Sequence, residues 1–381
     1  MTRPGVEIVT IDNPTPAQVP TDTSVLFVCG ATGIQPSPLA PVKVRSMSDY
    51  TAALGQRTAP TAATYDALDS FFGEGGGIAY VSPMKSSNLQ VADYQAALAL
   101  LDKGLGPGQV ITPDAAANLA TVQSAVLAHC AAANRVALFS SAAAADKTAL
   151  LAAAAALASD INASYGAFFG PTCEVPGLTA GTTRQIGWAA LEAGIIARND
   201  LTLNQDVAAA GDNGQSAFAL SIDPVGTAAL TDQDYQDLNA GGVCMARNRY
   251  GTLETYGYRS LSTDPDWVQF GWARLRMAIA ADAEAIGEAY VFSQIDGRGK
   301  TISRFAGDLG AMLAGYYQQG ALYGDTAEDA FRVRVAPPIN TDATIANGEL
   351  HAQLLVRMSP FSELVRIEIV KVAITQALVA A

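Results

Sequence analysis

The stretch of this sequence that most resembles a catalytic motif is QIDGRGKTISRF, residues 294–305. Its triplet GKT ends the phosphate-binding loop of many ATPases and GTPases. Such a loop also needs a glycine five positions before Gly299, because backbone N–H groups must wrap the phosphate, and that position holds Gln294. The sequence therefore favours a polar turn, between a strand over Ala289–Ser293 and a helix over Ser303–Gln319, rather than a nucleotide site.

Histidine chemistry is limited to two residues, His129 and His351. His129 lies in a predicted Ala-rich helix beside Cys130, and His351 lies in a predicted terminal strand with aliphatic neighbours. Neither is near a GxSxG nucleophile motif, so a Ser-His-Asp arrangement and a histidine metal site are both disfavoured. We predict no catalytic residues, no metal site and no cofactor, and expect a protein that is not an enzyme.

The acidic cluster TDQD, residues 231–234, has two possible interpretations. Its carboxylates could bind calcium, although the spaced carboxylates and turn glycine of an EF-hand loop are missing. Carboxylates are also favoured in the first turn of a helix, where they face the positive end of the helix dipole. A helix N-terminus explains the cluster as well as calcium does.

The composition limits the classes of protein to which this chain can belong. The chain has 381 residues, of which 50% are hydrophobic and 15% are charged, so it can bury a large core. The net charge of −13 argues against nucleic-acid binding, which needs lysines and arginines. The longest apolar run, ALLAAAAALA at residues 149–158, is too short to cross a bilayer, so we expect no membrane insertion.

Cysteine usage indicates the compartment. The four cysteines are far apart and lie among small or apolar residues, with neither zinc-site spacing nor the density of a disulfide framework. We predict reduced, mostly buried thiols. The start, MTRPGVEIVTI, has no apolar segment typical of a secretion signal, so we expect the protein to be made and kept in a reducing cytoplasm.

Alternating helix-like and strand-like runs place the chain in the α/β class. The first elements are strands over Ser24–Cys29 and Val42–Arg45 and a helix from Ser48, capped by its hydroxyl. A second helix over Tyr65–Phe72 is ended by GEGGG. Ala-rich helices then alternate with short apolar strands such as Val136–Ser140.

The last third has a different pattern. A long helix over Asp264–Ile286, interrupted near Gly271, precedes the polar turn and its following helix. Three strand-like runs then close the chain, FRVRV, LHAQLLVRM and LVRIEIVKVAI.

The two terminal runs have no obvious partner strand nearby. In PGVEIVTI, residues 4–11, Val6 and Ile8 share one face. In LVRIEIVKVAI, apolar residues alternate with Arg366 and Glu368 and then change phase; the apolar positions are Val365, Ile367 and Ile369, followed by Val370, Val372 and Ile374. The β-branched side chains disfavour a helix, so we predict a strand with a bulge, or one covered on both faces.

The order of these pieces resembles the contractile tail sheath proteins of bacteriophages and R-type pyocins. The likeness covers both ends of the chain well and the Ala-rich centre weakly. In the N-terminal third it is carried by PGVEIV, PTDTSVLFVCGATG, PVKVRSMSDYTAALG and FFGEGGGIAYV. Towards the C-terminus it is carried by TYGYRSLSTDPDW, GALYG, AFRVRV, NGEL and MSPFSELVRIEI.

The resemblance implies a mixed-sheet α/β core with extended N- and C-terminal β-strand arms that add to a small sheet in neighbouring subunits. It also implies a helical homo-oligomer around an inner tube, with baseplate and tail terminator proteins as further partners, assembled in the bacterial cytoplasm into a phage tail or a released contractile particle. The expected parts are an N-terminal linker arm (1–20), the N-terminal part of the core (21–90), a central α/β domain (91–250), a C-terminal sheath domain (251–361) and a C-terminal linker arm (362–381).

Arg298, Lys300 and Arg304 form a local excess of positive charge in an acidic chain. These residues either face the tube or form a solvated face.

Two alternatives to a sheath subunit remain. One is a subtilisin-like hydrolase, for which no credible histidine base is present. The other is a soluble α/β metabolite-binding protein, in which the terminal strands would be internal.

Overall fold

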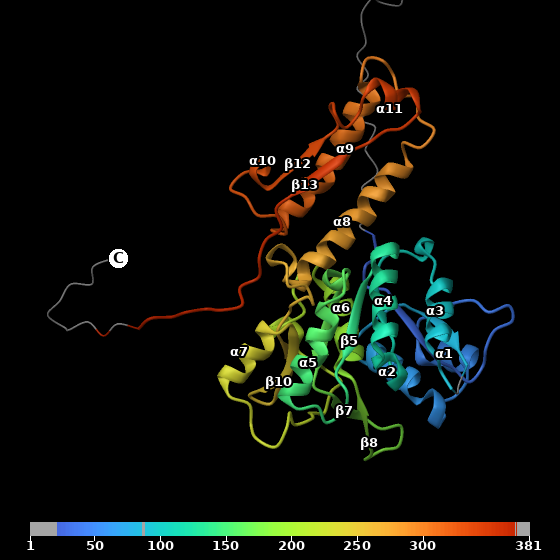
Figure 1. Ribbon diagram of the computed structural model, residues 1–381, viewed down its shortest axis with the longest axis vertical. Coiled ribbons are helices and arrows are strands. Elements are labelled where there is room, and N and C mark those ends of the chain that lie inside the picture. Colours follow the sequence, from blue (N-terminus) through green and yellow to red (C-terminus); the bar gives the residue numbers. More distant parts are fainter. Residues whose placement is uncertain (1–20, 86–87, 370, 372–381) are drawn as a thin grey trace, which may run out of the picture.

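The computed structural model describes residues 21–85, 88–369 and 371 (Figure 1). The predicted arm residues Val6, Ile8 and Val372 lie outside these residues.

An eight-stranded mixed sheet forms the centre of the molecule, and we call this sheet with its helices the body (Figure 1). The strand order is β11-β10-β6-β5-β4-β1-β3-β2, in which β2 and β11 pair antiparallel with their neighbours and the other pairs are parallel. The predicted mixed-sheet α/β core is confirmed. The strands are β1 (Leu26–Ala31), β2 (Val42–Val44), β3 (Ala79–Met84), β4 (Gln109–Ile111), β5 (Val136–Ser140), β6 (Gly166–Gly170), β10 (Val243–Arg249) and β11 (Thr252–Tyr256).

Helices cover both faces of this sheet. In β1, Leu26 and Val28 enter one core and Phe27 and Cys29 enter the other, which is why the strand is apolar throughout. The first core is covered by α1 (Met47–Leu54), α2 (Ala62–Gly73) and α6 (Trp188–Thr202), and the second by α3 (Val91–Leu100), α4 (Ala120–Ala133), α5 (Lys147–Ala158) and α7 (Asp232–Ala240). A small antiparallel sheet, β8-β7-β9, flanks the body with β7 (Cys173–Pro176), β8 (Thr183–Ile186) and β9 (Ser221–Ile222).

A second unit projects from the body, and we call it the distal unit (Figure 1). It consists of the C-terminal half of α8 (Phe270–Glu288), α9 (Lys300–Gln318), α10 (Ala327–Ala330), β12 (Phe331–Arg334), α11 (Asp342–Ala346) and β13 (Gln353–Val356). Near its start, α8 places Phe270 and Met277 in the core of the body. Its Leu275 and Ile279 pack instead with Leu313 of α9. One continuous helix therefore belongs to both units and connects them.

A buried ion pair fixes α8 to the body. The Arg274 guanidinium donates to both carboxylate oxygens of Asp200, each at 2.6 Å, and the two side chains are 1% and 4% exposed. Thr23 donates a further hydrogen bond to Asp200. The ion pair connects α8 to the C-terminal end of α6, and the hydrogen bond from Thr23 adds the residues just before β1.

Most predicted elements of the body are present, with two corrections near helix starts. Ser46, not Ser48, caps α1, because its side chain accepts the N–H of Asp49 at 3.1 Å. The helix predicted from Asp264 begins at Phe270, since Pro265–Trp267 forms a separate 3-10 turn. Gly271 is the second residue of α8 and does not interrupt it.

The strand predicted over Ala289–Ser293 is wrong. These residues continue from α8 as turns, in which Tyr290 N–H donates to the Gly287 carbonyl and Ser293 N–H donates to the Tyr290 carbonyl. The apolar and aromatic residues gave a strand propensity, but propensity in so short a run is outweighed by the helix before it. Phe292, in the left-handed region at φ 65°, ends the turn.

One buried carboxyl makes stability depend on pH. Burial raises the pKa of Glu192 to about 8, against the opposing effect of the Thr255 hydroxyl, which donates to it. In the unfolded chain a glutamate loses its proton near pH 4.3, so between that pH and about 8 the folded state binds more protons. The free energy of unfolding should therefore fall as pH rises through this window.

We expect Glu192→Gln to remove this slope. The variant should gain stability over the wild type as pH rises, by an amount on the order of a few kcal/mol at pH 8.5. Thermal unfolding from pH 5 to 8.5 measures the difference. If the melting temperatures of the wild type and the variant changed equally with pH, Glu192 would not be protonated in the folded state, and the prediction would be wrong.

Candidate assembly surfaces

The C-terminal tail runs away from the body (Figure 1). Val365, Ile367 and Ile369 are 74%, 79% and 93% exposed. The charged residues between them lie on a common side, with Arg366 Nε 3.5 Å from a carboxylate oxygen of Glu368. Within the described residues this segment has no strand partner. The predicted alternation is present, whereas the predicted pairing with a neighbour stays a prediction.

The base of the tail is held firmly. Phe361 N–H donates to Gln269 Oε1 at 2.8 Å, and Gln269 Nε2 donates to the Phe361 carbonyl at 3.0 Å. Trp272 Nε1 donates to the Ser359 carbonyl at 3.0 Å, and Arg259 forms an ion pair with Glu363. No pattern in the sequence indicates these contacts, because they join residues about 90 to 100 positions apart.

The two-stranded sheet β12-β13 can accept further strands. Its strands pair only with each other among the described residues, so both outer edges are unpaired. One face packs on α9, through Val333 and Leu354. The other face carries Arg332 and Arg334, which are exposed. An unpaired edge with one apolar face is the geometry that strand addition requires.

The predicted cationic residues gather near the start of α9. Arg298, Lys300 and Arg304 are all exposed, and no ion pair of theirs occurs in the described part of the chain. Phe292, in the adjoining turn, is fully exposed. The distal unit therefore presents positive charge and an aromatic ring together at the turn between α8 and α9.

The GRGKT segment does not form a phosphate loop. It follows a helix instead of the predicted strand, and its Lys300 and Thr301 already begin α9, three residues before the predicted helix start at Ser303. The Asp296 carboxylate accepts the backbone N–H groups of Arg298, Lys300 and Thr301, at 2.8, 3.2 and 3.2 Å. These bonds, that of Lys300 foremost, lower the pKa of Asp296. The chain's own carboxylate thus occupies the helix N-terminus where a phosphate would bind.

The two histidines lie in different surroundings. Burial, assisted by the Arg135 guanidinium, lowers the pKa of His129 to about 4, so its ring is neutral at pH 7. Its Nε2 is 2.9 Å from Arg135 Nη1 and accepts that donor. His351 precedes β13 instead of lying in it, and it is exposed beside Glu349. His129 therefore supports Arg135, whose guanidinium also binds the Leu101 and Asp102 carbonyls.

All four cysteines are free and buried, as predicted. Burial raises the pKa of the Cys29 thiol to about 12.

The acidic cluster at residues 231–234 begins a helix. Thr231 caps α7, and the carboxylates of Asp234 and Asp237 bind Lys147 at 2.7 Å. The helix interpretation of this acidic cluster is confirmed. In the described ranges, no group of three or more His, Cys, Asp or Glu side chains could hold a metal ion.

No helix among the described residues is long and apolar enough to span a bilayer.

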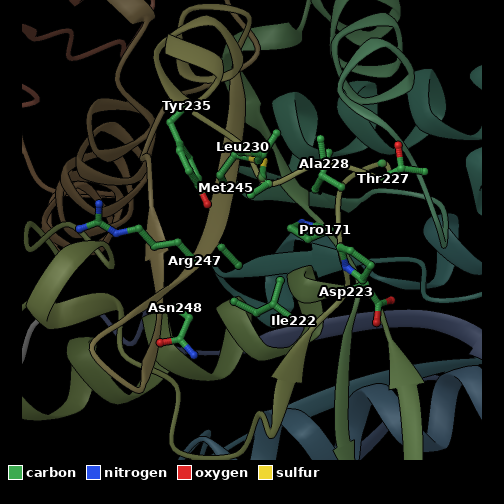
Figure 2. A pocket seen from close by; sticks show the side chains of 15 residues that line it. Pro171, Ile222, Asp223, Thr227, Ala228, Leu230, Tyr235, Met245, Arg247 and Asn248 are labelled. Atoms are coloured by element: carbon green, nitrogen blue, oxygen red, sulfur yellow. The ribbon is translucent and has the colours of Figure 1, made fainter. Parts of the chain in front are cut away.

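A pocket of about 370 Å³ opens where β6 and β10 end (Figure 2). Tyr235 and Arg247 lie on one side of it, and Asp223 lies on the other. Arg247 binds Glu254 and stacks on Tyr256, 3.2 Å from the ring centre. The Asp223 carboxylate accepts hydrogen bonds from Thr172 and Gln185. Both charged side chains are therefore engaged by the protein itself.

Comparisons place this fold among known structures. No family model and no curated protein matches the sequence. A chain of the anti-feeding prophage (AFP) baseplate is 22% identical, with a TM-score of 0.73, and the match covers 97% of this chain and 99% of that one. A chain of the AFP helical sheath in the contracted state is 24% identical, with a TM-score of 0.70 and coverage of 97% and 99%.

A third structure is the contracted sheath complex of PVC, an extracellular contractile injection system. Its chain is 18% identical, with a TM-score of 0.72, and the match covers 97% of this chain and 98% of that one. The likeness thus includes the body, the distal unit and nearly the whole length of each relative. The chain has the mixed α/β fold of the sheath proteins of contractile injection systems.

Proposed function

We propose that this protein is the structural subunit of a contractile sheath, which polymerises around an inner tube and contracts to drive that tube through a target cell envelope. The near full-length likeness to chains of contracted AFP and PVC sheaths carries the proposal. The exposed apolar tail and the unpaired edges of β12-β13 support it independently. The role is structural and needs neither catalysis nor a cofactor.

The linkage between subunits follows from the two surfaces. Residues 1–20 and 362–381 act as arms, and β12-β13 of a neighbour receives them. Val365, Ile367 and Ile369 would turn towards α9 of that neighbour, while Arg366 and Glu368 would lie on its open face. Backbone hydrogen bonds add about 0.5–1.5 kcal/mol each, so the apolar side chains must supply much of the affinity. Contacts of this head-to-tail kind build a helix when they do not close into a ring.

Contraction in this account is a change between two packings of linked rigid subunits. The extended sheath is metastable and is held by a kinetic barrier, so firing needs no nucleotide. The partners are other sheath subunits, the inner tube, the baseplate and a tail terminator. Assembly takes place in the bacterial cytoplasm, and the product is a phage tail or a released contractile particle.

Negative-stain microscopy of the purified chain, expressed with its tube and baseplate proteins, tests the proposal. We expect striated sheaths of uniform width around tubes, some of them shortened. A protein that remains dispersed with all of these partners present would contradict a sheath role. A metabolite-binding protein or a hydrolase would give that dispersed result.

The cationic residues at the start of α9 are proposed to face the tube. Exposed ion pairs are individually weak, about 0–1 kcal/mol, so they can guide assembly and still be released on contraction. Lys300→Glu with Arg304→Glu should shorten sheaths on tubes and weaken co-assembly most at low salt. Lys43→Glu on β2 with Arg45→Glu just after it changes net charge equally, and this variant should assemble normally. Unaltered co-assembly of the first variant across a salt series would count against the tube-facing position.

A further inference from the structure

The roots of both predicted arms lie on one helix, α8. At the N-terminal side, Thr21 N–H donates to the Asp282 carboxylate of α8 at 2.9 Å. At the C-terminal side, Phe361 and Ser359 are held by Gln269, immediately before α8, and by Trp272 in its first turn. Trp272 and Asp282 are ten positions apart, which is about 15 Å along a helix.

The Phe361 ring is tightly packed at the C-terminal root. Its ring lies over Gly271, and a Cβ placed on that glycine would come within 2.0 Å of the ring. The ring also meets Tyr258 edge-on, with centroids 6.3 Å apart. Nearby, Ser359 N–H donates to the Ala321 carbonyl beyond α9, so the root touches the distal unit as well as the body.

The ion pair between Glu363 and Arg259 marks where this root ends. Phe361 is half-buried, and Ser362 and Glu363 are exposed, but Glu363 is still held by Arg259 through both carboxylate oxygens. The next residue, Leu364, is 82% exposed, and the apolar side chains after it are exposed to a similar degree. The free tail therefore begins at one defined residue.

We infer that α8 is the common anchor of both arms, and that Phe361 is a positioning residue that fixes where the C-terminal arm leaves the subunit. This inference rests on the proposed function, in which the arms connect neighbours. Any pull on the C-terminal arm reaches Phe361 and passes into α8, which is joined to the body by Arg274 and to the distal unit by α9. The two units then turn as one when a neighbour moves.

The anchor itself can be tested on the purified chain with a protease that cleaves after glutamate. In the wild type, cleavage after Glu368 in the free tail should be about tenfold faster, or more, than cleavage after Glu363 at the root. Gly271→Ala displaces the Phe361 ring and should raise the Glu363 rate to that of Glu368. Gly287→Ala is the matched control, since it lies in the same helix with open space around it and should leave both rates unchanged. Phe361→Ala removes the ring without altering α8 and should repeat the effect.

The role in linkage needs a second readout. Co-expressed with tube and baseplate proteins, the Gly271→Ala and Phe361→Ala chains should form sheaths that break or fail to contract along their length, whereas Gly287→Ala sheaths should resemble the wild type. Equal wild-type cleavage at Glu363 and Glu368 would overturn the anchor. Normal contraction by chains whose Glu363 site is exposed would overturn its role. Failure of the wild type to form any sheath would instead refute the proposed function and leave the protease result intact.

Discussion

Replacing both Ile367 and Ile369 with aspartate should yield a folded monomer that cannot extend a sheath. In the separate chain these side chains are 79% and 93% exposed, so the substitutions should change the free energy of unfolding by less than about 0.5 kcal/mol. In an assembled sheath they would place two carboxylates against the apolar face of a neighbour, at a cost of several kcal/mol. That cost corresponds to a loss of affinity of about a thousandfold or more.

The same segment supplies a matched control. Exchanging the charges, as Arg366→Glu with Glu368→Arg, alters the opposite face of the tail and preserves net charge. This variant should assemble as the wild type does. Sedimentation separates polymer from monomer, and a melting curve confirms folding. Long sheaths from the double aspartate variant would show that this face of the tail is not buried between subunits.

Arg274→Met should cause the largest loss of stability of any single change considered for this chain. The substitution leaves Asp200 buried at 4% exposure without its guanidinium. Breaking a buried ion pair in this way costs about 3–5 kcal/mol, because a charge remains without compensation. Chemical denaturation should show this loss. The C-terminal end of α6 and the N-terminal part of α8 should exchange amide hydrogens faster than in the wild type.

Two further variants test whether the cost comes from the orphaned charge. Asp200→Asn added to Arg274→Met should recover part of the lost stability, since the asparagine is neutral and can still bind Thr23. Lys103→Met breaks the exposed pair with Glu284, whose side chains are about half exposed, and should cost less than about 1 kcal/mol. Equal losses from Arg274→Met and Lys103→Met would contradict a special role for the buried pair.

Local patterns in the sequence predicted the body well. Val136–Ser140 is predicted with its bounds intact, because a short apolar run between two Ala-rich helices has few other readings in an α/β chain. The stop after α2 was also predictable, because GEGGG is a poor helix former. The sequence could not show that Glu74 in this stop is fully buried and accepts the backbone N–H groups of Ala217 and Phe218. That role depends on residues more than 140 positions away.

Contacts between distant segments determine the features that local sequence patterns do not predict. Nothing near Gly271 indicates that Phe361 lies over it, and a glycine inside a helical pattern was interpreted as an interruption. The strand expected over Ala289–Ser293 failed for a related reason, since strand-forming residues need a neighbouring strand and none lies beside them in the described structure. The alternation of apolar and charged residues in the tail could be predicted, because successive side chains of an extended chain point to opposite sides.

A helical reconstruction of the assembled protein at high resolution tests the central claim most directly. The account predicts that residues 365–369 of one subunit lie as an added strand beside β12-β13 of a neighbour, with Ile367 and Ile369 facing that neighbour's α9. A map in which these residues pack only against their own subunit would contradict it.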